Sequence, residues 1–163
     1  MAAGVSIAVT TTSTARAFER QWHAGLDGGY ASLFGDNASS GFGGGAHLSY
    51  GLSDAFNALV ELDATRHPSM PTTVWSGAAG VAYTLDVARA VPYAGLLGAA
   101  YKLTGGLPTV APGVQIVLGL DYQLERSFAI GLELRMHTIF ARDPVGTVAY
   151  GTTFLNVQYL WGF

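Results

Sequence analysis

The sequence has no cysteine and few charged residues, and each shortage excludes a class of protein. Without cysteine there is no disulfide framework, no cysteine-ligated zinc and no thiol catalysis. Charged residues make up 12% of the 163-residue chain, against about 25% in typical soluble domains. The net charge of −3, with no basic cluster, disfavours a nucleic-acid surface. No run of about 18 apolar residues is present, which excludes a transmembrane helix.

Half of the residues are nevertheless hydrophobic, and an apolar excess without a long apolar run favours a membrane β-barrel. In such a barrel each strand alternates between lipid and lumen. The end of the chain shows this alternation, with Asn156 and Gln158 on the polar face. The apolar face carries Leu155, Val157, Tyr159, Trp161 and Phe163. In a soluble protein this stripe would face water, which is unfavourable.

From residue 18 onwards, segments of about ten residues alternate with turn-forming residues. We expect strands over residues 22–34, 42–52, 56–66, 73–85, 91–103, 113–124, 128–140 and 149–163. Apolar residues in these segments recur at every second position, whereas a helix would place them three and four apart. Eight is an even number, as a closed bacterial barrel requires. The expected fold is therefore all-β: a closed, eight-stranded, antiparallel up-and-down transmembrane β-barrel formed by residues 18–163.

The expected connections alternate between short polar turns and longer loops. Short turns fall at residues 53–54, 86–90 and 125–127, and longer loops at 35–41, 67–72, 104–112 and 141–148. Short turns are typical of the periplasmic end of bacterial barrels, so we expect both termini to be periplasmic. Residues 1–17 combine a short apolar segment with the small-x-small pattern of Ala15-Arg16-Ala17. We interpret them as a truncated signal segment or a disordered tail.

Aromatic residues are concentrated near the ends of the expected strands, often eight residues apart. Eight residues at ~3.3 Å each, tilted by about 40°, climb roughly 20 Å, close to the height of a membrane barrel's apolar band. The pattern predicts aromatic girdles at both membrane interfaces. The girdle residues would be Tyr50, Phe56, Trp75, Tyr83, Tyr93, Tyr101, Tyr122, Phe128 and Phe140. The alternative is that aromatic residues are simply common in strands.

If the apolar faces point outward, the polar residues of the same strands enter the lumen. This predicted lumenal set is Asp27, His47, Glu61, Asp63, Lys102, Asp121, Glu133, Arg135 and His137. Charged groups inside the barrel must form ion pairs, accept or donate hydrogen bonds, or contact water. We expect ion pairs between Lys102 and Asp121 and between Glu133 and Arg135. Strand glycines such as Gly119 are expected to permit tight curvature.

An eight-stranded barrel has just enough interior for its own side chains, so we expect no wide pore. A narrow ion or proton path along Glu61, Asp63 and Glu133 is one alternative function. A soluble lipocalin-like ligand-binding barrel is the alternative fold, with an apolar interior and a polar exterior.

The terminal strand ending at Phe163 resembles the signature strand by which the barrel assembly machinery recognises bacterial outer-membrane barrels. Together with the eight alternating segments and the girdles, it makes residues 18–163 similar to small outer-membrane β-barrels of the OmpA/OmpX type. The resemblance implies a monomeric Gram-negative outer-membrane protein with a structural or interaction role. It also implies contact with outer-membrane lipid and lipopolysaccharide. The insertion signal would be Leu155, Val157, Tyr159, Trp161 and Phe163.

Some outer-membrane barrels are lipid A deacylases or acyltransferases that use a serine, a histidine and an acid. In the deacylase pattern a serine follows the histidine by two positions, but Ile139 occupies that place after His137. Thr138 should point at lipid while His137 points inward, which separates nucleophile from base. We therefore expect no catalytic residue, and this enzyme class stays an alternative.

We expect neither a metal nor another cofactor. No pair of histidines has convincing metal-ligand spacing. The glycine-rich stretch at residues 41–45 superficially resembles a nucleotide loop, but no helix follows it, so that motif lacks its required context.

Overall fold

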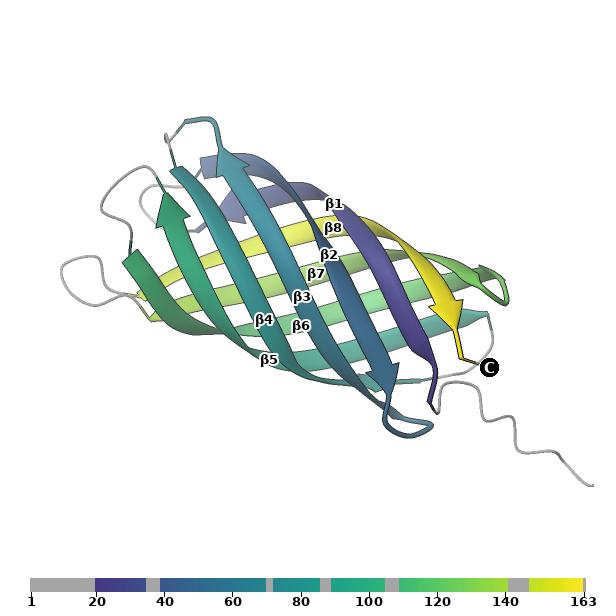
Figure 1. Cartoon of the computed structure of the whole chain (residues 1–163). Helices are drawn as coiled ribbons and strands as arrows, with labels where there is room; N and C mark the ends of the chain where they lie inside the picture. The colour runs from purple at the N-terminus through teal and green to yellow at the C-terminus, as the bar shows by residue number, and fades with distance from the viewer. Residues whose placement is uncertain are drawn as a thin grey trace, which may run out of the picture.

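The computed structural model describes residues 20–34, 39–69, 72–85, 89–104, 109–140 and 147–162, and within these ranges all regular structure is β-strand. The strands are β1 (Trp22–Leu33), β2 (Ser39–Gly51), β3 (Phe56–His67), β4 (Thr72–Thr84), β5 (Ala90–Thr104), β6 (Thr109–Glu125), β7 (Phe128–Phe140) and β8 (Thr147–Trp161). Each strand pairs antiparallel with the next, and β8 pairs with β1 to close the barrel (Figure 1). The predicted eight-stranded closed barrel is confirmed. The described ranges contain no helix that could cross a membrane.

Five strands begin earlier than the sequence predicted, β4 and β5 by one residue each, and the clearest case is β6. It starts at Thr109 rather than at residue 113, and Pro112 lies within it. Pro112 is opposite Ala100 of β5, whereas pairing with β7 begins only at Gly113. Among the described residues, the first residues of β6 have no partner on the β7 side, and a strand tolerates proline where such pairing is missing. Likewise, β2 begins at Ser39 and β8 at Thr147.

Side chains alternate strictly between the interior and the exterior of the barrel. In β7, Leu132 and Leu134 are 46% and 47% exposed, whereas Glu133 and Arg135 are 2% and 0% exposed. Large apolar side chains are exposed on all eight strands. The interior holds buried charged residues together with smaller apolar clusters, and the exterior is apolar on every strand. The soluble lipocalin-like alternative requires a polar exterior, so this orientation is the opposite of the one it needs.

The sequence predicted the wrong face of β5 as the inward one. Lys102 is exposed on the outside of the barrel, whereas Tyr93 and Tyr101 point inward and do not belong to an outer girdle. Alternation could not decide the phase because both faces of β5 are apolar, with Leu96 outside and Leu97 inside. The inward phase gives both tyrosine hydroxyl groups polar partners in the lumen, which buried hydroxyl groups require.

This inversion also removes the predicted ion pair between Lys102 and Asp121. In the sheet, Lys102 lies opposite Trp75 on one side and Val110 on the other. Asp121 lies opposite Val91 and Gly131, and it points inward. The two residues therefore lie on opposite faces of the barrel wall.

The two ends of the described chain lie together at one end of the barrel (Figure 1). The Arg20 N–H donates to the Gly51 carbonyl at 2.9 Å, beside the β2–β3 turn. In that turn the Ser53 hydroxyl accepts from the N–H of Phe56 at 3.1 Å, which closes a tight connection. The predicted signal segment at residues 1–17 lies outside the described residues, as do much of the longer loops and Phe163.

Candidate functional site

Arg135 lies inside the barrel, is fully buried, and faces four carboxylates. Its Nη1 is 2.6 Å from Asp63 Oδ1, and its Nη2 is 3.2 Å from Asp27 Oδ2. Its Nε is 3.5 Å from Glu61 Oε2 and also donates to Glu133. The predicted pair of Glu133 and Arg135 is thus present. The guanidinium connects β7 to β1 and β3 across the lumen.

Each of these four carboxylates has a further polar partner on another strand. The partners are His47 for Asp27, Gln115 for Glu61, Ser76 for Asp63 and Tyr93 for Glu133. They come from β2, β6, β4 and β5 respectively. The guanidinium of Arg135 also lies 5.0 Å from the centre of the Phe154 ring on β8, a cation–π contact. The Arg135 network therefore joins all eight strands around one cation.

On the loop side of this network the lumen is filled by aromatic rings around His137. The His137 ring stacks on Tyr150, with 4.1 Å between ring centres and 1° between ring planes. Its Nδ1 is 3.2 Å from the Tyr101 hydroxyl, and its Nε2 is 3.3 Å from the Thr152 hydroxyl. Ile139 packs in the same cluster. These buried side chains form an aromatic layer in the barrel interior, between the Arg135 network and the loop end.

Glycines on neighbouring strands provide room for the largest of these inward side chains. Three such glycines lie directly opposite the side chain they accommodate. The pairs are Gly25 with His47, Gly45 with Asp63, and Gly119 with Tyr93. A Cβ atom added at these glycines would lie 2.1–2.3 Å from the facing side chain, closer than real atoms approach. The glycines thus determine which polar groups fit inside the barrel.

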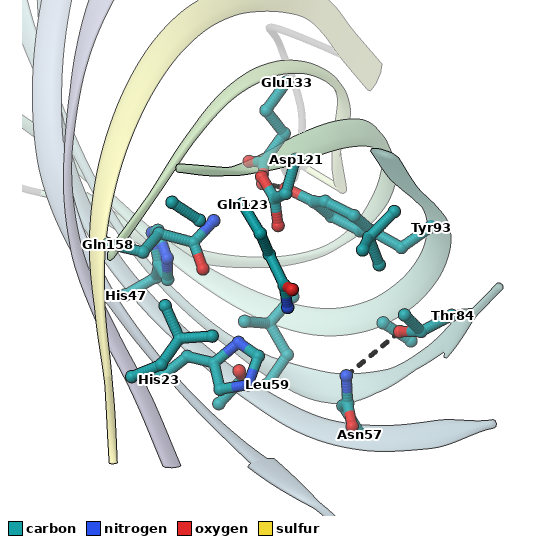
Figure 2. Close-up of a pocket in the computed structure, with 15 residues that line it drawn as sticks. His23, His47, Asn57, Leu59, Thr84, Tyr93, Asp121, Gln123, Glu133 and Gln158 are labelled. Atoms are coloured by element: carbon teal, nitrogen blue, oxygen red, sulfur yellow. Dashed lines mark hydrogen bonds between the residues drawn. The ribbon is translucent and has the colours of Figure 1, made fainter. Parts of the chain in front are cut away.

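On the turn side of the network a small cavity of about 40 Å³ remains (Figure 2). His23, His47, Tyr93, Asp121 and Glu133 are among the residues that line it. A cavity of this size is large enough to hold water. It ends at the Arg135 network, since Glu133 and His47 belong to both.

The described part of the lumen has an acidic balance. It contains five carboxyl groups and one guanidinium, those of Asp27, Glu61, Asp63, Asp121, Glu133 and Arg135. An interior of this sign attracts cations and repels anions. Among the described residues, however, no group of three or more histidine and acidic side chains is arranged to hold a metal ion.

The structure places the predicted lumenal residues inside the barrel, with Lys102 as the exception. Six are buried alongside Arg135, and Asp121 is partly buried. The sequence interpretation missed the lumenal roles of Tyr93 and Tyr101 because it put both tyrosines outside. It also missed Phe154, whose inward position follows from its phase with Asn156 in β8.

The other residues of the predicted girdles have outward-pointing side chains. The exposed members are Phe56, Trp75, Tyr83, Tyr122, Phe128 and Phe140. Tyr50 is half-buried because its ring packs 4.6 Å from that of Trp22. In the terminal strand, Leu155, Val157, Tyr159 and Trp161 are exposed.

His137 does not meet a serine within the described part of the chain. Its two ring nitrogens face the hydroxyl groups of Tyr101 and Thr152, both inside the filled lumen. Thr138 lies at the next position of β7, on the outward face, and Ile139 is buried. In the described part of the chain His137 is buried, with 2% of its surface exposed.

No protein family model matches the chain, and no curated relative matches it in sequence. Solved structures do match. Neisserial surface protein A superposes with a TM-score of 0.72 and 17% identity, covering 85% of this chain and 96% of its own. The N-terminal β-barrel domain of Pseudomonas aeruginosa OprF has a TM-score of 0.64 and 15% identity, and the match covers 88% of this chain and 98% of that domain. Ail, the attachment invasion locus protein of Yersinia pestis, has a TM-score of 0.59 and 13% identity, and the match covers 88% of this chain and 100% of Ail.

These proteins are small eight-stranded outer-membrane barrels. The chain has their fold. The resemblance predicted from the terminal strand, the alternating segments and the girdles is therefore confirmed at the level of the fold.

Proposed function

We propose that this chain is an integral barrel of the bacterial outer membrane, with a structural or interaction role and a lumen closed by side chains. One observation carries the proposal: apolar side chains are exposed on all eight strands while the charged network is buried. In water this surface would be a large aggregation-prone patch, whereas in a bilayer it is matched to the solvent. The fold shared with outer-membrane barrels supports the same conclusion.

The arrangement of the chain ends supports a periplasmic position for both termini. Arg20 and Gly162 lie at the end of the barrel that carries the β2–β3 turn. Turns at the periplasmic end of bacterial barrels are short, and the terminal strand β8 would then present its apolar stripe to the barrel assembly machinery. In this orientation the opposite end of the barrel contacts lipopolysaccharide. We also propose that the barrel is a monomer.

The proposal predicts that the folded protein needs detergent or lipid and migrates differently on a gel before and after boiling. Without boiling, the closed hydrogen-bonded sheet should resist unfolding by dodecyl sulfate. The protein in the unboiled sample should therefore migrate as a compact species. The measurement is gel mobility of protein refolded in detergent, with boiled protein as its control. Monodisperse, stable protein in buffer without detergent would overturn the membrane assignment.

A narrow cation path is the second candidate function, and the acidic balance of the lumen is the observation that favours it. Against it stand the Arg135 network and the aromatic layer around His137, whose buried side chains lie across the interior. The remaining cavity of about 40 Å³ ends at Arg135. We therefore propose that the lumen is closed in the resting state.

Liposomes containing the folded barrel should leak potassium ions and protons no faster than protein-free liposomes. The physical reason is that any ion would have to displace Arg135 from four carboxylates. The measurement is flux across liposomes loaded with a pH-sensitive dye, with gramicidin as the positive control. A cation-selective flux that falls in Glu61→Gln would contradict a closed lumen and establish the narrow path.

A further inference from the structure

Strands β3, β4 and β5 lie side by side in the barrel wall (Figure 1). The outer surface of the barrel is hollowed over them. Two adjoining hollows of about 520 and 530 Å³ lie there, and both are lined by Leu62, Gly77 and Ala100. The second hollow continues to Ala79 and Gly98. We call these two hollows together the β3–β5 groove.

The small residues of this groove contrast with the opposite wall of the barrel. Outward positions of β7 carry Leu132, Leu134 and Met136, and each of them is about half exposed. In β5, by contrast, Gly98 and Ala100 take the corresponding outward positions. A hydrocarbon chain in the β3–β5 groove would therefore contact the sheet backbone closely, whereas on β7 it would meet protruding side chains. Closer packing gives more dispersion contacts per methylene group.

Two cations face outward towards the loop end of the groove. Lys102 lines the groove on β5, beside Trp75 on the neighbouring strand. Arg66 is exposed on β3, and it lies opposite Thr73 of β4. Arg66 lies opposite Thr73 and Lys102 opposite Trp75, so β4 separates the two cations and Arg66 is two positions nearer the loop end. Their backbones are thus about two strand spacings of ~4.8 Å apart across the sheet and about two residues of ~3.3 Å apart along it. The ion pairs of the described residues include neither of them. Their charges thus remain available to an anionic head group.

We propose that the β3–β5 groove binds the lipid A part of lipopolysaccharide, with one acyl chain over Gly98 and Ala100 and phosphates at Lys102 and Arg66. The proposal rests on the proposed function, because that orientation puts Lys102 and Arg66 in the outer leaflet. Two cations on strands separated by β4 suit a head group with two phosphates better than a phospholipid with one. The Trp75 ring beside Lys102 occupies the interfacial level where such a head group lies.

A second copy of the chain is a less suitable occupant of the same groove. Two barrels related by a twofold axis along the membrane normal would meet at the same depth. Lys102 and Arg66 of one copy would then approach the same cations of the other. Like charges placed together in this way oppose association. The charge of the groove therefore favours an anionic lipid over a dimer.

The test measures retention of bisphosphoryl lipid A by the detergent-refolded barrel, using native mass spectrometry. A Cβ atom added at Gly98 would meet nothing within 4 Å, so Gly98→Leu should fill the groove without disturbing the fold. We expect one lipid A per barrel, held at least tenfold more weakly by Gly98→Leu. The double substitution Lys102→Ala with Arg66→Ala should weaken it to a similar degree. Phosphatidylglycerol should bind at least fivefold more weakly than lipid A.

Gly28→Leu is the matched control, because Gly28 also faces outward on β1 and a Cβ atom there meets nothing within 4 Å. It should retain lipid A like the unchanged chain. Equal retention by Gly98→Leu and Gly28→Leu would overturn the site, as would equal binding of phosphatidylglycerol. A dimer that Gly98→Leu dissociates would assign the groove to a second copy instead. Only protein with the heat-dependent gel shift is assayed, so failure of membrane residence is detected before any lipid is added.

Discussion

Replacing Arg135 with leucine should lower the free energy of unfolding by about 3–5 kcal/mol, the usual cost of removing one partner from a buried ion pair. The cost arises because Asp27, Asp63, Glu61 and Glu133 would remain in the lumen without their shared cation. A loss of this size is a large part of a typical stability of ~5–15 kcal/mol. The measurement is reversible urea unfolding of the refolded protein in detergent or lipid vesicles.

Leu134→Ala is the neighbouring control for Arg135→Leu. Leu134 is 47% exposed on the outer face, so lipid or detergent can fill the space that the substitution creates. The control should therefore cost less than Arg135→Leu. Equal losses from the two substitutions would mean that the guanidinium has no special role in the lumen.

The stability deficit of Arg135→Leu should shrink as the pH is lowered below neutrality. Protonated carboxyl groups need no cation, so the folded variant would take up protons that its unfolded chain does not yet hold. Stability rises with falling pH wherever the folded state binds more protons. A deficit that is constant with pH would indicate lost packing rather than unpaired carboxylates.

The sequence was sufficient to predict the number of strands, their approximate bounds and, for most of them, which face points into the barrel. Strands such as β7 are unambiguous because charged and aliphatic residues alternate, with Glu133 and Arg135 between leucines. A phase error there would place an arginine in lipid, at about 2–4 kcal/mol near the bilayer midplane. Because the two possible orientations of such a strand differ so much in energy, the alternation of its residues is enough to predict which face points inward.

In β5 the same rule failed because the sequence offers no comparable energetic difference. Lys102 is the strand's charged residue and lies near its loop end, where a cation can reach the membrane interface. Tyr93 and Tyr101 are amphipathic, so they suit either a girdle or a polar lumen. What decides the phase is the partners Glu133 and His137, which belong to β7 rather than to a strand adjacent to β5.

The four-carboxylate environment of Arg135 was not predictable either. Asp63 precedes Arg135 by 72 residues, and the two strands lie across the barrel from one another. Their contact depends on how far each strand is staggered against the next, which alternation within single strands does not define. Glycines carry part of this information, since Gly45 lies opposite Asp63 and leaves space for its carboxylate. Their predicted role in curvature thus covers only part of what they do here.

Gly119→Ala should destabilise the barrel by about 1–3 kcal/mol, the usual cost of overpacking a filled interior. The new Cβ atom would lie 2.1 Å from Cζ of Tyr93, so the ring must move. Tyr93 lines the small cavity on the turn side of the Arg135 network, and the displaced ring would have to move into that space. Movement would also separate the Tyr93 hydroxyl from Glu133 and disturb the carboxylate that Arg135 contacts.

A double-mutant cycle with Tyr93→Leu separates this steric effect from any change in strand propensity. If the clash with the tyrosine ring is the cause, Gly119→Ala should cost clearly less in the Tyr93→Leu background than in the unchanged chain. Contacting residues couple by 0.5–3 kcal/mol in such cycles, whereas independent sites add. Gly28→Ala is the control for propensity, because its Cβ atom would meet nothing within 4 Å. Additive losses at Gly119 and Tyr93, or an equal loss at Gly28, would show that Gly119 does not make room for the Tyr93 ring.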